Sequence, residues 1–315
     1  MVPIPLLTWL VQNRRNFTAA INSLQVALRA DEKDAPSWTR LGEAYLLSGR
    51  HTAALKSFMH AKELDPSNWT IDYFVAWVKQ DLTEYDEAIA LYRAILEGHP
   101  DETGVTFALA NALLLAGRKH RTTGFFDRAV DDVANSVSLS VTLLQGDLGF
   151  KLTVWKLLTD GLLALPMDND QDTEAVVTAL DGVQSLVSNS SGEVTDILPL
   201  GGPSATGVPL PLLLAAHVCQ NRVNVLAEGD SVARAAAFHD LSMVMHRVSL
   251  TTATLEIKQK CKALRLATSK QAVKLDPTED AHWTALGVAS FGDNVDVAQH
   301  AFIRAIELDG TVSVM

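Results

Sequence analysis

Apolar residues recur along the chain at intervals of three and four, the spacing that gathers side chains on one face of an α-helix. Between Trp38 and Pro66 two such stretches follow each other, and Gly49 separates them. Glycine readily ends a helix and proline cannot continue one. This segment therefore predicts a pair of helices closed at Gly49 and Pro66.

The positions within this pair match the tetratricopeptide repeat (TPR), a hairpin of two helices whose signature has fixed spacings. Every position of the signature is filled, in order by Trp38, Leu41, Gly42, Tyr45, Ala54, Phe58, Ala61 and Pro66. The first helix carries its aromatic and aliphatic residues on one face. Small residues, Gly42 and Ala54, stand where two helices must cross closely. The match at fixed offsets is a strong repeat signal.

Moving the frame by the repeat length of about 34 residues predicts neighbouring units. One step forward finds Ala76, Ala88, Tyr92 and Pro100. A second step finds Ala110, Leu113, Phe126 and Ala129, with Gly117 as the predicted turn. One step back finds the second-helix residues Ala20, Leu24 and Ala27. Residues 1–130 are thus interpreted as consecutive helical pairs, each burying its apolar face on its neighbours.

Beyond Gly124 neither Gly nor Pro occurs before Gly146, which predicts an unusually long helix. The motif restarts at Trp155, followed by Leu158 and the small Thr159. Helices are predicted over 174–187, 212–228, 233–248 and 251–275, and a loop or disordered insertion over 188–211. The last unit opens at Trp283 and continues with Leu286, Gly287, Ala298, Phe302 and Ala305.

These signals predict an all-α fold, a right-handed TPR solenoid of helix hairpins. Its predicted units are 1–34 (degenerate), 35–68, 69–102, 103–150 (extended second helix), 151–228 (with the insertion), 229–278 and 279–310, followed by a tail at 311–315. A solenoid needs end repeats with a polar outer face. Neither end supplies one, so we expect an internal section, or a truncated reading, of a longer repeat protein.

Composition narrows the function. The chain has 26 Lys+Arg and 37 Asp+Glu, a formal net charge of −11, which argues against a nucleic-acid-binding segment. The basic helix predicted over 251–275 spreads its lysines around the helix, so a solvated outer face is favoured over direct RNA contact. Two cysteines, too few for a disulfide framework, indicate a reducing compartment. No run of about 18 apolar residues occurs, so no membrane span is predicted. We expect a cytoplasmic protein, with the nucleus left open.

Enzyme motifs fail at particular positions. Gly202 and Gly207 have the spacing of a phosphate-binding loop, but Val208 and Pro209 follow where Lys and Ser/Thr are needed. Ser204 lacks the flanking glycines of a nucleophile elbow. We predict no enzyme.

Candidate metal ligands also fail. Asp168, Asp170 and Asp172 begin like a calcium loop, but Thr173 and Ala179 stand where Gly and a bidentate Glu are required. The pairs His239 with His246 and His217 with Cys219 fall short of the four donors of a zinc site. Cys261 lies among lysines that could lower its pKa, with no catalytic base nearby. We predict no metal and no cofactor.

A TPR array exposes the first helices of its units on a concave surface that can hold a partner segment. By offset, the groove candidates are Thr39, Glu43, Tyr73, Trp77, Phe107 and Asn111. Chaperone-binding TPR domains resemble one another in carrying Lys and Asn at the first two sites, where they clamp a carboxylate. Glu43 would repel that anion, so no such clamp is predicted. Tyr73 and Trp77 are either partner anchors or packed between helices, and packing is favoured.

Longer stretches resemble one family. Leu41-Gly-Glu-Ala-Tyr45, Ala53-Ala-Leu-Lys-Ser-Phe58, Trp155-Lys-Leu157 and Trp283-Thr-Ala-Leu-Gly-Val288 are similar to the TPR scaffold subunit of the superkiller (Ski) complex in its animal form. The resemblance covers most of residues 20–310. It implies a non-enzymatic scaffold that organises a cytoplasmic complex with a DExH-box RNA helicase and a WD-repeat protein. That complex feeds RNA to the exosome for 3′-to-5′ mRNA decay. Two alternatives stay open: a TPR peptide-binding adaptor of an unrelated complex, and a regulatory TPR segment of a larger enzyme.

Overall fold

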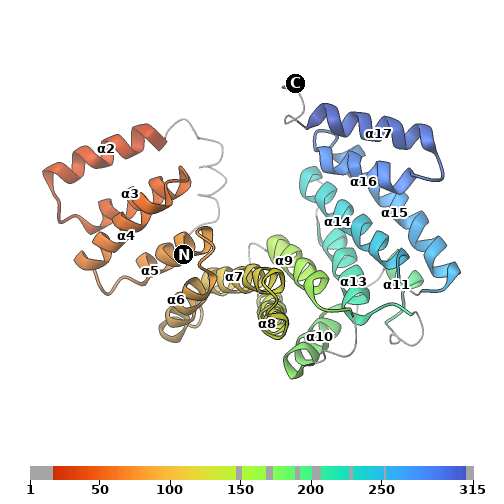
Figure 1. The fold of residues 1–315 in the computed structure, drawn as a ribbon, viewed down its shortest axis with the longest axis horizontal. Coiled ribbons are helices and arrows are strands. Elements are labelled where there is room, and N and C mark those ends of the chain that lie inside the picture. The colour runs from red at the N-terminus through yellow and green to blue at the C-terminus, as the bar shows by residue number, and fades with distance from the viewer. Residues whose placement is uncertain are drawn as a thin grey trace. The chain divides into compact units, whose positions relative to one another are not determined.

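The computed structural model describes residues 17–146, 151–167, 173–188, 192–200, 207–226, 230–251 and 253–309. Every regular element in these ranges is a helix, and the chain divides into two compact units, Met1–Asp132 and Val133–Met315 (Figure 1). The all-α prediction is confirmed. The first 16 residues, the calcium-like aspartates 168–172, the segment 201–206 with Gly202 and Ser204, and the tail 311–315 lie outside the described residues.

The N-terminal unit is a series of helices, and each of the first five packs on the next. They are α2 (Phe17–Ala30), α3 (Ala35–Leu47), α4 (His51–Leu64), α5 (Trp69–Asp81), α6 (Tyr85–Gly98), α7 (Thr103–Thr122) and the start of α8 (Phe126–Gln145). Among the alternate helices, α3 also contacts α5, and α5 contacts α7. This arrangement places the first helices of successive hairpins side by side, as a TPR array requires.

Short turns and caps set the helix ends in this unit. Gly49 and Gly124 adopt φ of +77° and +87°, a left-handed backbone that glycine adopts without a side-chain clash. Asp34 and Asn68 cap α3 and α5 by accepting hydrogen bonds from the backbone of Ser37 and Thr70. The chain thus reverses within a few residues, and consecutive helices fold back on one another.

The hairpin α3–α4 closes around one ring. Phe58 is fully buried, and its ring lies so close to Gly42 that a Cβ added there would be 2.5 Å from Phe58 Cε1. Phe58 also stacks on Phe74 of α5, with ring centroids 5.2 Å apart. Gly287 and Phe302 repeat the close approach with the same 2.5 Å separation in the C-terminal unit. A small residue at this crossing lets the second helix approach the first.

The prediction of a turn at Gly117 is wrong. Gly117 is buried inside α7, which continues to Thr122, and the turn lies at Gly124. Seven extra residues add about two helical turns, so the same face stays buried. Counted from the turn glycine, Val133 rather than Phe126 corresponds to Phe58. Val133 is 1% exposed and Phe126 is 57% exposed, which corrects the predicted position of the packed residue.

The buried residues of α2 also differ from those predicted. Ala20 and Ala27 are exposed, whereas Ile21 and Leu28 are buried and join a cluster with Leu41 of α3. α2 packs on α3, so the buried face is the one turned toward α3.

The C-terminal unit holds the rest of α8 and the helices α9 (Lys151–Ala164), α10 (Glu174–Val187), α11 (Glu193–Ile197), α13 (Leu210–Val225), α14 (Ser231–Ser249), α15 (Leu255–Leu275), α16 (Asp280–Ser290) and α17 (Val295–Leu308). α9 packs on α13, and α10 and α11 also contact α13. The pairs α14–α15 and α16–α17 form further hairpins, and α14 touches α16. The helices α10 and α11, which come between α9 and α13 in the sequence, are thus packed on the unit's own helices.

The predicted helix over 174–187 is confirmed, as is the long helix after Gly124. The loop predicted over 188–211 is wrong in its described part, because it contains α11 and the buried side chains Val194, Leu198 and Val208. A helix of five residues is too short to show a helical period. The basic helix starts at Leu255 rather than at residue 251, since the Thr254 hydroxyl caps it by accepting from the Ile257 N–H.

Candidate functional site

The first-helix positions chosen from the repeat spacing share an intermediate exposure. They are Thr39, Glu43, Tyr73, Trp77, Phe107 and Asn111, on α3, α5 and α7. Their inward neighbours Leu41, Ala76 and Ala110 are buried. Because α3, α5 and α7 lie side by side, these six side chains come from three adjacent helices of one unit. They form the candidate groove.

Aromatic rings dominate the middle of the candidate groove. The Tyr73 ring contacts the rings of Phe74, Trp77 and Tyr92 at centroid separations of 5.7, 6.4 and 5.8 Å. Tyr92 is 1% exposed, while Tyr73 and Trp77 are half-buried, so this pair packs on the hairpin core and still offers ring surface. Burial raises the pKa of the Tyr73 hydroxyl, which stays neutral at physiological pH.

The charged residue of the candidate groove, Glu43, is acidic, and a second carboxylate, Asp81, ends α5 one turn after Trp77. Burial raises the pKa of Glu43, and the Arg40 guanidinium partly opposes that rise. Burial likewise raises the pKa of Asp81, opposed by His51, whose ring nitrogen lies 3.8 Å away, and by a hydrogen bond from Trp77. A partly desolvated carboxylate repels an anion and attracts a cation or a hydrogen-bond donor. This surface therefore suits an apolar or basic partner segment better than an acidic one.

The motif residues of α3 mostly take part in packing. Trp38 donates from Nε1 to the Glu32 carbonyl at 2.9 Å, and its ring meets His60 edge-on with centroids 4.6 Å apart. The Tyr45 hydroxyl accepts from Gln25 at 2.8 Å. In the last hairpin, Trp283 repeats this pattern: it donates to the Pro277 carbonyl at 2.9 Å. Pro66 follows the end of α4 at Leu64.

The motif residues of the C-terminal unit are mostly buried. Trp155 and Leu286 are each 7% exposed, Gly287 is buried, and Trp283 is half-buried. Thr159, the small residue after Leu158, is 1% exposed and lies 3.7 Å from the Cys219 sulfur. It stands on α9 and Cys219 on α13, so this crossing joins α9 to α13.

A network of charged side chains begins one residue after Trp155, and it was not predicted from the sequence. Lys156 Nζ lies 2.9 Å from Asp160 and 3.1 Å from Asp240, and Arg222 also pairs with Asp240. Arg222 and Asp240 are nearly buried. Burial lowers the pKa of Lys156, but the two carboxylates more than offset this and the pKa is raised. Counting one and five residues from Trp155, as for Thr39 and Glu43, would have found Lys156 and Asp160.

The histidines considered as metal ligands have other partners. His217 is buried against the Leu198 carbonyl, 2.8 Å from Nε2, and burial lowers its pKa. His246 accepts from Arg265, and burial together with that guanidinium lowers its pKa. The His239 ring lies 5.5 Å from that of His282. Across the described ranges, no group of three or more His, Cys, Asp or Glu side chains could hold a metal ion.

The basic helix is less solvated than its charge suggests. The lysines around Cys261 do not lower the pKa of its thiol, because the thiol is buried and burial raises its pKa to about 11. Arg265 is 8% exposed rather than solvated, and it donates to the carbonyls of Val288 and Ala289. Lys260 and Lys262 pair with Glu256 and Asp293. Much of the positive charge of this helix is therefore used within the unit.

No helix in the described part of the chain is long and apolar enough to cross a bilayer.

Comparison with known proteins identifies related sequences. A family model described as tetratricopeptide repeat matches residues 10–68 and 76–136. Superkiller protein 3 of Schizosaccharomyces pombe is 27% identical over 285 residues, covering 88% of this chain and 20% of that protein. Superkiller complex protein 3 of Mus musculus is 32% identical over 289 residues, covering 90% of this chain and 17% of that protein. The chain thus spans about a fifth of the length of these relatives. The solved structure of yeast Tom70 is similar at 14% identity with a TM-score of 0.47, covering 94% of this chain and 55% of that one.

Proposed function

Because this chain is a tetratricopeptide-repeat protein homologous to superkiller protein 3, we propose that it is a non-enzymatic scaffold of a superkiller-type complex. The main support for this proposal is the extent of the homology, because the two superkiller relatives are 27–32% identical to this chain over about nine-tenths of its length. A family model for the repeat matches residues 10–68 and 76–136. The function is proposed to be protein binding by stacked hairpins, in support of 3′-to-5′ mRNA decay by the exosome in the cytoplasm.

The proposed partners are a DExH-box RNA helicase and a WD-repeat protein. The candidate groove supports a protein partner, because half-buried aromatic side chains are frequent anchors of interfaces. Its acidic residue Glu43, together with Asp81 at the end of α5, favours a segment that is apolar or basic. The ion pairs of the basic helix support contact with proteins rather than RNA, since Lys260 and Lys262 are already paired.

Affinity purification of the tagged protein from its own cells tests this proposal. The helicase and the WD-repeat protein should co-purify in near-stoichiometric amounts and resist ribonuclease treatment. Absence of both would overturn the assignment to a superkiller-type complex. Recovery of both only without ribonuclease would show RNA bridging in place of scaffolding.

Variants of the candidate groove ask whether that surface holds the partner. Glu43→Lys reverses the charge of its acidic residue and leaves the buried motif residues in place. Glu32→Lys makes the same charge change at an exposed site before α3 and is the matched control. We expect the groove variant to lose a partner while the control retains it. Equal recovery of all partners would place their contacts elsewhere on the chain.

A second candidate function is a peptide-binding adaptor of an unrelated complex, favoured by the exposed ring surface of Tyr73 and Trp77. The same purification separates the two functions. Stoichiometric recovery of other proteins through the candidate groove, without a helicase, would favour the adaptor.

A further inference from the structure

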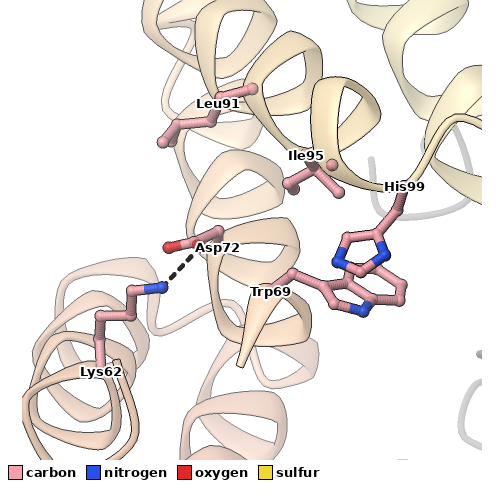
Figure 2. Close-up of a pocket in the computed structure, with 8 residues that line it drawn as sticks. Lys62, Trp69, Asp72, Leu91, Ile95 and His99 are labelled. Atoms are coloured by element: carbon pink, nitrogen blue, oxygen red, sulfur yellow. Dashed lines mark hydrogen bonds and ion pairs between the residues drawn. The ribbon is translucent and has the colours of Figure 1, made fainter. Parts of the chain in front are cut away.

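A pocket of about 300 Å³ lies between α4, α5 and α6 of the N-terminal unit, and its lining shares no residue with the candidate groove. Figure 2 shows Lys62 and Asp72 on one side and the rings of Trp69 and His99 on another, with Leu91 and Ile95 of α6 beside them. Lys62 Nζ is 2.6 Å from Asp72, and the Trp69 and His99 centroids are 5.3 Å apart. We call these residues, with Ala94 and Gly98, the outer pocket.

The outer pocket exists because this hairpin lacks two bulky side chains that the preceding hairpin has. One repeat length before Asp72 and Ala94 stand Trp38 and His60, whose rings pack against each other with centroids 4.6 Å apart. In α5–α6 both positions hold small side chains. The space that an indole and its partner fill in α3–α4 is therefore open in α5–α6.

The last hairpin shows what else can fill this position. There Trp283 occupies the place of Trp38, and Arg304 lies over its ring with the guanidinium carbon 5.8 Å from the centroid. Arg304 stands at the second-helix position that His60 holds in α4 and Ala94 in α6. An arginine against an indole is thus a packing that this chain already uses at the equivalent place.

The electrostatics around the outer pocket favour a cation. α4 and α6 both end beside it, at Leu64 and Gly98, and the carbonyl end of a helix carries partial negative charge. Carboxylates dominate these two helix ends and the turns after them: Glu63, Asp65, Glu97, Asp101 and Glu102. The lysine among them, Lys62, is already paired with Asp72.

We propose that the outer pocket binds an arginine side chain from a segment of a partner protein. The guanidinium lies against the Trp69 indole and shares the Asp72 carboxylate with Lys62, while its methylene groups contact Leu91 and Ile95. Arginine suits this site better than lysine, because its planar group stacks on an aromatic ring and also donates to a carboxylate. The inference rests on the proposed function only in requiring a protein partner, and it adds a surface separate from the candidate groove.

Selection from a randomised peptide library displayed on phage, against the purified 315-residue chain, tests the proposal directly. Peptides that carry an arginine should be enriched, and replacing that arginine by lysine should weaken binding about fivefold or more in calorimetry. Enriched peptides without arginine, or no enrichment, would overturn the proposal. This outcome is separate from the proposed function, because complex assembly is not measured.

Two variants assign the binding to the outer pocket. Asp72→Trp with Ala94→His rebuilds the ring pair of α3–α4 and should abolish binding of the arginine peptide. Ala94→Arg places a guanidinium where Arg304 stands in the last hairpin, so it should fold as well as the natural chain and compete with the peptide. Ala90→His is the matched control, since residue 90 is exposed on α6 one turn earlier and does not line the pocket. Unchanged binding by folded Ala94→Arg would contradict the proposal even if the double variant failed to fold.

Discussion

Because α3 and α4 approach closely at Gly42, we predict that Gly42→Ala lowers the stability of the protein. In most helices this change stabilises, because alanine exceeds glycine in helix propensity by about 1 kcal/mol. Here the added Cβ would lie 2.5 to 2.8 Å from three carbon atoms of the Phe58 ring. That ring is fully buried and stacked on Phe74, so it has little room to move away.

The clash should outweigh the gain in propensity. Overpacking a rigid core costs about 1–3 kcal/mol, and a contact this short belongs at the upper end of that range. We therefore expect a net loss of about 2 kcal/mol, or a melting temperature lower by roughly 4–8 °C for a unit of this size. Thermal and urea unfolding, followed by circular dichroism, measure the change.

A control and a second-site change separate the clash from other effects. Gly104→Ala adds the same methyl group in the first turn of α7, where no atom lies within 4 Å, and should be neutral or stabilising. In a Phe58→Leu background, Gly42→Ala should lose at least about 1 kcal/mol of its cost, because the ring atoms it meets are gone. If Gly42→Ala stabilises the natural chain as Gly104→Ala does, the reasoning about this crossing is refuted.

Three further predictions concern the C-terminal unit. Asp240→Ala leaves the nearly buried Arg222 without its carboxylate partner. It should lower the free energy of unfolding, measured in urea, by about 3–5 kcal/mol. A loss below about 1 kcal/mol would show that the pair is solvated. Burial lowers the pKa of His217, so the unfolded chain takes up a proton on this histidine at a higher pH than the folded chain does. The free energy of unfolding therefore has its full value above about pH 6.5, the pKa in the unfolded chain, and decreases as the pH falls toward the folded pKa. His217→Gln should therefore reduce the loss of melting temperature on acidification, and an unchanged pH dependence would contradict this. Burial raises the pKa of Cys219 to about 12 and that of Cys261 to about 11. Iodoacetamide at about pH 8 should therefore label both thiols only after unfolding, as measured by mass spectrometry. Rapid labelling of the folded chain would contradict their burial.

The helices that the sequence predicts best are those whose ends are marked by a capping residue or by a glycine. The helix over 174–187 begins after Thr173, whose hydroxyl caps it, and its predicted bounds agree with the structure. The long helix after Gly124 is predicted because neither Gly nor Pro interrupts it before Gly146. In both cases the signal is local, so neighbouring helices do not need to be known.

The wrong turn at Gly117 has a physical explanation. A fixed repeat frame assumes equal hairpins, but α7 is longer than α3 by seven residues. Such an extension keeps the apolar face in phase, so no interruption marks it. Gly117 packs inside the helix instead of ending it, and the left-handed backbone at Gly124 makes the turn.

Contacts between distant helices account for what the sequence could not show. Arg222 and Asp240 pair across α13 and α14, and Arg265 reaches carbonyls of α16. Charge alone suggests solvent for such residues, since pairing depends on which helices meet. The outer pocket is different in kind, because the replacement of Trp38 and His60 by Asp72 and Ala94 is visible in a repeat alignment.

The central claim is that these hairpins hold other proteins together. Its most direct test is native mass spectrometry of the full-length protein mixed with the purified helicase and WD-repeat subunits of its own organism. We predict one stable complex of defined stoichiometry that forms in the absence of RNA and is lost when residues 17–309 are deleted. Formation of the same complex without this segment, or no complex at micromolar concentrations, would contradict the claim.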